Sequence, residues 1–216
     1  MAKKEDEKGE KQIKHSYRFK LAGVALANFA LYYLVVSTDS LRVAGLSALF
    51  QNWKELVPGS VALVLTGALN SLLDSTTKAR LVFWKWKNPL PGTEAFSKHA
   101  KDDPRINVAT LKARFGPLPR GAYEQNSLWY KMYSAISSKP AVMDAHVDFL
   151  VHRDYACIGV LFLVAFGIPA FFFASLNVAG GYLAMLLVQC LLAMQAARNS
   201  GVRLVTTVLA IRSAEG

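Results

Sequence analysis

The residues best suited to chemistry lie just before the third apolar run of this 216-residue chain. On a helix, Asp144, Asp148 and His152 recur at every fourth position and therefore share one face. Two carboxylates and an imidazole in such a row can bind a divalent metal, or a carboxylate can orient the imidazole as a general base. One interpretation is therefore an acid–base or metal site that acts on a lipid or a lipid-linked phosphate.

Other features of the sequence favour a surface without catalysis. A catalytic metal needs more converging ligands, and neither an HExxH spacing nor a cysteine pair accompanies the row. The chain also lacks a glycine-rich phosphate loop and a GxSxG nucleophile elbow. Aspartates beside Arg153 on a helix surface ordinarily form solvated ion pairs. We therefore predict no enzymatic activity, no bound metal and no cofactor.

Long apolar segments must position these residues. Four runs without Lys, Arg, Asp or Glu occupy residues 21–36, 57–73, 155–176 and 178–197. A helix needs about 20 apolar residues to cross a bilayer, with roughly 17 as the lower limit. The second run is at this limit, and the first reaches it when Ser37 and Thr38 are added. In a soluble helical domain, the alternative class, core helices carry a polar stripe, which the third run lacks.

The fold class that follows is an all-α membrane protein. We predict four transmembrane helices in two antiparallel pairs, with a mainly helical cytoplasmic insert. The expected parts are a basic cytoplasmic tail (1–20), a first transmembrane pair (21–75) with an outer amphipathic segment (44–56), the insert (76–152), a transmembrane hairpin (153–197) and a second cytoplasmic tail (198–216).

The distribution of basic residues predicts the orientation. Of the 25 lysines and arginines, seven precede the first run and 13 lie between the second and third, whereas two lie between the first and second. Cytoplasmic segments retain the excess of Lys and Arg, so both termini and the insert should be cytoplasmic. The positive charge then faces the anionic inner leaflet, and a nucleic acid partner is not needed to explain it.

Aromatic residues mark the expected membrane interfaces. Trp53 lies on the apolar face of the outer amphipathic segment, which either rests in the outer interface or caps the helices. Four residues directly after the second run alternate aromatic and basic side chains: Trp84, Lys85, Trp86 and Lys87. This pattern suits headgroup depth at the inner interface. It also suits stacking on single-stranded nucleic acid, which we consider the weaker interpretation at this position.

The insert should consist of short helices between proline-rich turns. Two segments, 108–115 and 127–137, are the expected helices, and the second carries Trp129, Met132 and Tyr133 on one side. This apolar side either packs as local core or binds a partner protein. After the fourth run, residues 204–211 can form a strand, an interfacial segment or a helical extension, and their hydrophobicity predicts docking against the insert.

The third and fourth runs should form a tight hairpin. Asn177 followed by two glycines predicts the outer turn, and Pro169 predicts a kink in the third span. Small residues allow helices to approach closely, and we expect this at Gly159, Gly167, Gly180 and Gly181. These surfaces predict a homo-oligomer in the lipid bilayer.

Three strings, WKWKNPLPG, DPRIN and EQNSLWYKMY, lie in the insert. With its size and span pattern, the chain resembles small four-span bacterial membrane proteins of phage-defence cassettes, including effectors that accompany retrons or cyclic-nucleotide systems. The resemblance implies a non-enzymatic effector or sensor of the bacterial inner membrane that oligomerises and perturbs the membrane on a cytoplasmic signal. The alternative is a membrane anchor that recruits a cytosolic partner through residues 76–152.

Overall fold

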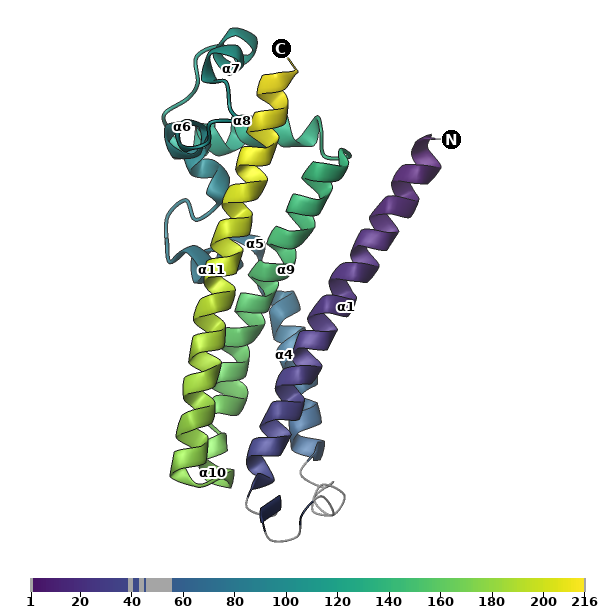
Figure 1. Cartoon of the computed structure of the whole chain (residues 1–216), viewed down its shortest axis with the longest axis vertical. Coiled ribbons are helices and arrows are strands. Elements are labelled where there is room, and N and C mark those ends of the chain that lie inside the picture. Colours follow the sequence, from purple (N-terminus) through teal and green to yellow (C-terminus); the bar gives the residue numbers. More distant parts are fainter. Residues whose placement is uncertain (1, 39–40, 43–44, 46–55, 216) are drawn as a thin grey trace. The chain divides into compact units, whose positions relative to one another are not determined.

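The structure, a computed structural model, describes residues 2–38, 41–42, 45 and 56–215. It is 82% helix, and no strand occurs among these residues, which confirms the all-α prediction. Figure 1 shows the helices. They are α1 (Ala2–Val36), α4 (Leu56–Leu72), α5 (Ser75–Phe83), η2 (Pro91–Glu94), η3 (Ala95–His99), α6 (Ala100–Asp102), α7 (Val108–Phe115), α8 (Ala122–Ser134), α9 (Pro140–Phe162), η4 (Leu163–Gly167), α10 (Ala170–Phe173) and α11 (Leu176–Ala214).

In the described part of the chain, three segments are long and apolar enough to cross a membrane. They are Phe19–Val36, Pro140–Phe173 and Leu176–Ala214. Residues Leu63–Leu72 of α4 form a shorter apolar helix. The structure therefore supports a membrane protein, while the fourth span remains a prediction. The outer segment 44–56, including Trp53, lies outside the described residues except for Gly45 and Leu56.

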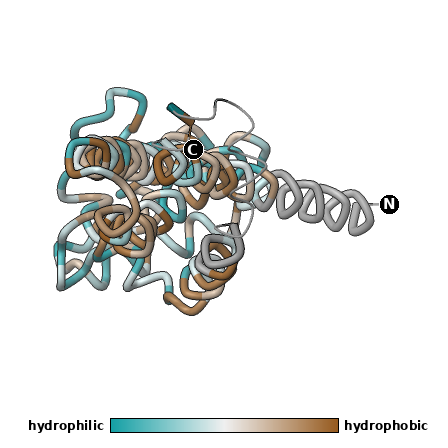
Figure 2. Tube along the Cα trace, turned by 90° about the horizontal axis from the view of Figure 1, so that it is seen from below, coloured by the Kyte–Doolittle hydropathy of each residue, from teal (hydrophilic) through white to brown (hydrophobic). Residues whose placement is uncertain are grey.

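The chain divides into two compact units. Unit 1 comprises the described residues of 1–14, 75–153 and 194–216, and unit 2 those of 15–74 and 154–193. Three helices, α1, α9 and α11, contribute residues to both units because the boundaries fall inside them. Figure 2 shows hydrophobic residues along most of the helices, whereas hydrophilic stretches lie mainly in the connecting loops.

The core of unit 2 is apolar and rich in aromatic rings. Phe162 and Phe166 stack with ring centroids 4.6 Å apart, and Tyr32 of α1 meets Phe166 edge-to-face at 4.9 Å. Tyr182 and Leu186 of α11 complete this buried cluster. A polar contact also joins two helices, because the Tyr17 hydroxyl donates to the buried Asp154 carboxylate.

The outside of unit 2 also carries many large hydrophobic side chains. Of 24 large hydrophobic side chains that are exposed in the described residues, 20 belong to this unit. They include Phe19 and Phe172, which are 74% and 81% exposed. Contiguous exposed apolar surface of this kind marks contact with lipid or another protein. Its extent over several helices supports a surface that faces hydrocarbon.

Small residues contribute to helix packing in unit 2 at some of the predicted positions. A Cβ built on Gly159 would lie 3.6 Å from Cys190 Cα, and one on Gly167 would lie 2.9 Å from Leu183 Cδ1. These two glycines therefore face α11 within the chain. Gly180 and Gly181 have nothing within 4 Å of such a Cβ, so the described part of unit 2 leaves that face of α11 open.

The hairpin differs from the prediction at its turn. The chain reverses at Ala174 and Ser175, and Asn177 already belongs to the first turn of α11, so the predicted turn at Asn177 is wrong. Pro169 lacks a backbone N–H and cannot continue the helical ladder. The chain accordingly forms the π-helical turn η4 and a turn at Ile168 and Pro169 before α10, so the regular α-helix is interrupted where a kink was predicted.

Local signals explain the helices of unit 1. Asn107 begins α7 because its side-chain oxygen accepts from the backbone N–H groups of Ala109 and Thr110. Gly116, with φ 77°, ends this helix at the predicted position. The next helix begins at Ala122, earlier than predicted, because the extended Gly121 accepts the first helical hydrogen bond from Gln125.

The core of unit 1 joins the insert to the end of α11. Leu204, Val205, Val208 and Leu209 pack in one cluster with residues of α7, α8 and α9. Residues 204–211 are therefore a helical extension of α11, and the predicted docking against the insert is confirmed. Close packing is visible at Gly201, where a Cβ would lie 3.1 Å from Phe149 Cε2 and from Phe83 Cζ.

Candidate functional site

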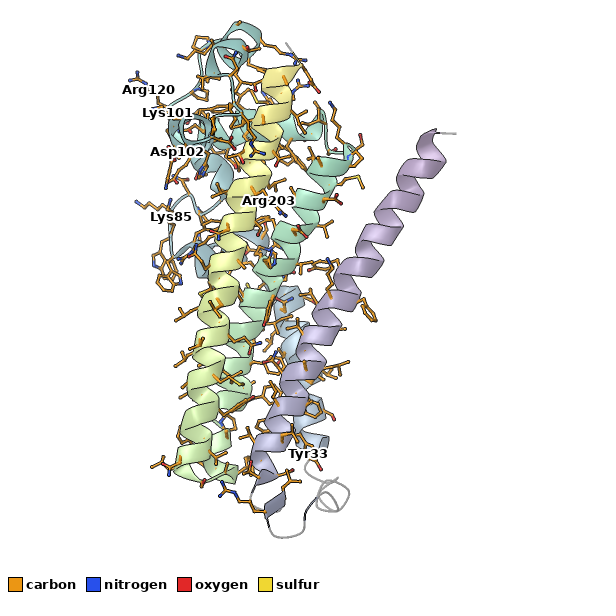
Figure 3. All side chains as sticks on the ribbon, viewed as in Figure 1. Tyr33, Lys85, Lys101, Asp102, Arg120 and Arg203 are labelled. Atoms are coloured by element: carbon orange, nitrogen blue, oxygen red, sulfur yellow. The ribbon has the colours of Figure 1, made fainter. Side chains whose placement is uncertain are left out.

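The row of Asp144, Asp148 and His152 lies on α9, but the structure does not build it into a larger ligand set. Asp144 is exposed, and Asp148 accepts from the guanidinium of Arg203 on α11, which Figure 3 labels. Asp148 is therefore paired across two helices rather than with the neighbouring Arg153. Across the described ranges, no group of three or more His, Cys, Asp or Glu side chains is placed to hold a metal ion.

The apolar side of α8 faces inward. Met132 is 1% exposed and Trp129 is 8% exposed, and both belong to the core of unit 1. The structure thus favours local core over partner binding for these two residues, because a buried side chain offers no surface to a second protein. Tyr133 is half-buried. Tyr123 and Tyr130, on other sides of α8, are 77% and 58% exposed.

A cavity of about 350 Å³ opens beside this core, and we call it the aromatic cavity. It is bounded by the loop at Leu90, by α8 and by the part of α9 that carries His146 and Arg153. Trp129 and Tyr133 form one wall, with stacked rings 5.6 Å apart. Leu204 of α11 also lines it. Two of the helices that continue into unit 2, α9 and α11, therefore contribute to this cavity.

Several hydrogen-bond donors line the aromatic cavity. Burial raises the pKa of Tyr133, so its phenol stays protonated at neutral pH and can donate to His146 Nδ1, 2.9 Å away. The indole Nε1 of Trp129 is buried and makes no hydrogen bond in the described structure. The Arg153 guanidinium lies 5.9 Å from the ring centroid of Phe149. An occupant rich in acceptor atoms would complement this set.

A second cavity, of about 500 Å³, adjoins the first, and both are lined by Leu90 and Asn126. We call it the cationic cavity, because Arg80 and Lys87 line it and none of its lining residues is acidic. Arg80 is held in place by a 3.1 Å hydrogen bond from Nε to the carbonyl of Trp86. Its terminal amino groups remain available for an anion.

The loop between the two cavities has a defined backbone. Asn88 has φ 50°, a left-handed conformation that asparagine tolerates better than most residues. Thr93 Oγ1 donates to the carbonyls of Asn88 (3.1 Å) and Leu90 (2.6 Å). A Cβ on Gly92 would lie 2.5 Å from Asn126 Oδ1 and 2.8 Å from Trp129 Cε3, so only glycine fits there. Sequence reasoning noted the NPLPG turn but missed that it divides two cavities.

The predicted interface residues after the second run lie on the surface of unit 1. Trp84 is 64% exposed and Trp86 is 82% exposed. The Arg198 guanidinium stacks over the Trp84 ring at 4.7 Å, and its Nε donates to the Val82 carbonyl at 2.6 Å. Lys85 pairs with Glu94, whose pKa it lowers, and its side chain points outward in Figure 3.

The large hydrophobic side chains that unit 1 exposes are all aromatic and carry a polar group. Within its described residues they are two tryptophans and two tyrosines: Trp84, Trp86, Tyr123 and Tyr130. Trp86 and Tyr123 line the cationic cavity, and Tyr130 lines the aromatic cavity. Such amphipathic rings prefer the boundary between water and lipid. The two cavities therefore lie on a surface suited to a membrane interface.

Comparison of the chain with protein-family models, with curated proteins and with solved structures finds no match.

Proposed function

We propose that the chain is a non-enzymatic effector of the bacterial inner membrane, with unit 1 in the cytoplasm as the sensing part. In this proposal α4 is the fourth span, the spans form two antiparallel pairs, and both termini are cytoplasmic. The charge bias supports this orientation, since 13 of the 25 basic residues lie between the second and third apolar runs. Unit 2 then perturbs the bilayer when unit 1 receives a signal.

The observation that carries the proposal is the continuity of α9 and α11. Each helix contributes residues to the core of unit 1 and to the apolar core of unit 2, and the unit boundary falls within the helix. Both helices also line the aromatic cavity. An event that moves their cytoplasmic ends is therefore transmitted along the helix axis. A passive anchor would need no such connection.

Oligomerisation in the membrane is supported by the open face of α11. Gly181 and Ala184 are exposed, and Gly180 is half-buried. Small residues let a second helix approach closely enough for dispersion contacts in lipid. Gly159 and Gly167 do not serve this purpose, since both already pack within the chain.

The test uses cells that express the protein strongly while a voltage-sensitive dye reports membrane potential. Wild type should depolarise the cells. A Gly-Ser-Gly insertion after Arg153 in α9, or after Ala193 in α11, should abolish depolarisation because it uncouples the units. The matched control is the same insertion after Pro117, in the loop between α7 and α8, which should still depolarise. A normal potential with wild type, or full depolarisation with both helices interrupted, would contradict the proposal.

A second candidate, an anchor for a cytosolic protein, is favoured by the exposed Tyr123 and Tyr130. Exposed tyrosines are common anchors at protein interfaces. This function predicts a complex that survives purification of wild type and is lost from the Tyr123→Ala, Tyr130→Ala double variant. It also predicts a normal membrane potential at every expression level, which separates it from the effector.

A further inference from the structure

The cationic cavity has the composition of an anion site. Arg80 supplies a guanidinium that is oriented by its bond to the Trp86 carbonyl, and Lys87 supplies an ammonium group. Thr76 and Asn126 add a hydroxyl and an amide to the lining. With two cations and no lining carboxylate, an anion with several acceptor oxygens is the complementary occupant.

The surroundings of the cavity indicate where that anion comes from. Thr76 follows Leu72, the last residue of α4, by four positions, a chain length that spans at most about 14 Å. Trp86 and Tyr123, both strongly exposed, form part of the cavity lining. If α4 ends at the inner membrane surface, the cavity lies close to the headgroup layer, where aromatic rings and cations meet phosphate.

Another cationic cavity in unit 1 lacks these features. Lys101, Lys112 and Arg120 line a space of about 900 Å³, also without an acidic residue. Lys101 and Arg120, labelled in Figure 3, point outward. The hydrophobic lining there is Phe96, Val108 and Leu118, with no tryptophan or tyrosine. This cavity provides matched control positions. Its cations belong to the same unit and are exposed, as Arg80 and Lys87 are.

We propose that Arg80 and Lys87 bind the phosphate of an anionic phosphate ester, supplied by a phospholipid headgroup of the surrounding leaflet. The inference rests on the proposed membrane placement and deepens it, since it assigns a ligand class to the sensing unit. The Asn88–Thr93 loop separates this phosphate from the aromatic cavity, whose walls belong to α9 and α11. Headgroup binding is therefore placed beside two of the helices that contribute to both units.

Native mass spectrometry of the full chain in mild detergent tests the site. Phosphatidylglycerol is the anionic probe, phosphatidylcholine is the zwitterionic one, and glycerol 3-phosphate is the soluble phosphate ester. Wild type should retain phosphatidylglycerol in preference to phosphatidylcholine. The Arg80→Gln, Lys87→Gln variant should lose about tenfold in apparent affinity for phosphatidylglycerol, as expected when charge-assisted bonds are removed. Arg80→Lys, which keeps the positive charge, should lose less affinity for phosphatidylglycerol than the Arg80→Gln, Lys87→Gln variant.

The control is the Lys101→Gln, Arg120→Gln variant, which removes the same charges from the other cavity and should bind like wild type. Equal retention by the Arg80, Lys87 variant and wild type would overturn the proposal, as would an equal loss in the control. Binding of glycerol 3-phosphate as tight as that of phosphatidylglycerol would support the phosphate site and overturn its lipid source. Depolarisation is scored separately: lipid selectivity without depolarisation contradicts the effector alone, and depolarisation without selectivity contradicts the lipid site alone.

Discussion

The buried side-chain amide of Gln125 connects separate segments of unit 1 by hydrogen bonds. Gln125 is 2% exposed, and its Oε1 accepts from the backbone N–H groups of Phe96 and Ser97, both at 3.0 Å. Its Nε2 donates to the Arg120 carbonyl at 2.9 Å. One side chain thus satisfies three backbone groups that belong to different segments. Nothing in the local sequence pattern distinguishes Gln125 from its neighbours, the exposed Glu124 and the half-buried Asn126, so sequence reasoning did not select it.

Replacing Gln125 should destabilise unit 1 without any effect on charge. Gln125→Leu keeps the volume but leaves two N–H groups and one carbonyl without a partner. We expect a loss of about 2–4 kcal/mol in unfolding free energy, since each orphaned buried group costs about 1–3 kcal/mol. Urea unfolding of the purified protein measures it. Gln195→Leu, at an exposed position of α11, should change stability by less than about 0.5 kcal/mol. Equal losses of stability in the Gln125 and Gln195 variants would refute the stabilising role of Gln125.

An ion pair in the loop after α6 gives a pH-dependent prediction. The Arg105 guanidinium, 2.6 Å from Asp103 Oδ2, lowers the pKa of Asp103 to about 2 from its usual 3.8. Because folding favours the charged form, this stabilisation is present above about pH 4 and is lost as the pH falls through about 2. Its size is under about 1 kcal/mol, as Arg105 is largely exposed.

Arg105→Gln should therefore return the Asp103 pKa toward its usual value and remove this part of the acid dependence. NMR titration of the Asp103 carboxyl carbon measures the shift directly. Arg120→Gln, which removes an exposed arginine elsewhere in unit 1, serves as the control and should leave the titration as it is. An unchanged Asp103 titration in Arg105→Gln would show that another group holds the pKa down.

At the scale of elements, glycines in α11 have opposite roles in the two units. Gly201 lies against Phe149 and Phe83, whereas Gly181 has open space around it. Gly201→Ala should destabilise by about 1–2 kcal/mol through overpacking. In a monomer, where this face stays open, Gly181→Ala should be neutral or stabilise by about 0.5–1 kcal/mol, because alanine favours the helix. Thermal unfolding of both variants tests the pair, and a larger loss at Gly181 would mean that its face is occupied by a second copy.

Elements set by neighbouring residues could be predicted, and those set by distant contacts could not. The bounds of α7 follow from Asn107 and Gly116, which act within one helical turn. The hairpin turn was misplaced because Asn177, Gly180 and Gly181 resemble turn residues, yet they continue a helix that satisfies its own backbone groups. The cavities depend on α5, α8 and α9 meeting around the Asn88–Thr93 loop, a tertiary arrangement that periodicity does not encode.

At the scale of the whole molecule, the orientation in the membrane is the assumption on which both proposals depend. Ser97 of unit 1 and Ser175 of the hairpin turn are both exposed. With Cys157 and Cys190 changed to Ala, a cysteine at Ser175 should react with a membrane-impermeant thiol reagent in intact cells. One at Ser97 should react only after the membrane is opened, because the proposed topology keeps the basic insert in the cytoplasm. Labelling of Ser97 in sealed cells would invert the topology and exclude a cytoplasmic signal.

The discontinuous core of unit 1 has a consequence for biosynthesis. Residues 75–153 pack on Leu204, Val205, Val208 and Leu209, which follow them only after the last apolar run. During synthesis, the insert is therefore complete before the end of α11 that packs on it has been made. Its apolar surface is covered last, when the end of α11 emerges. A nascent chain interrupted before that point would hold the apolar segments but would lack the helix that completes the core of unit 1.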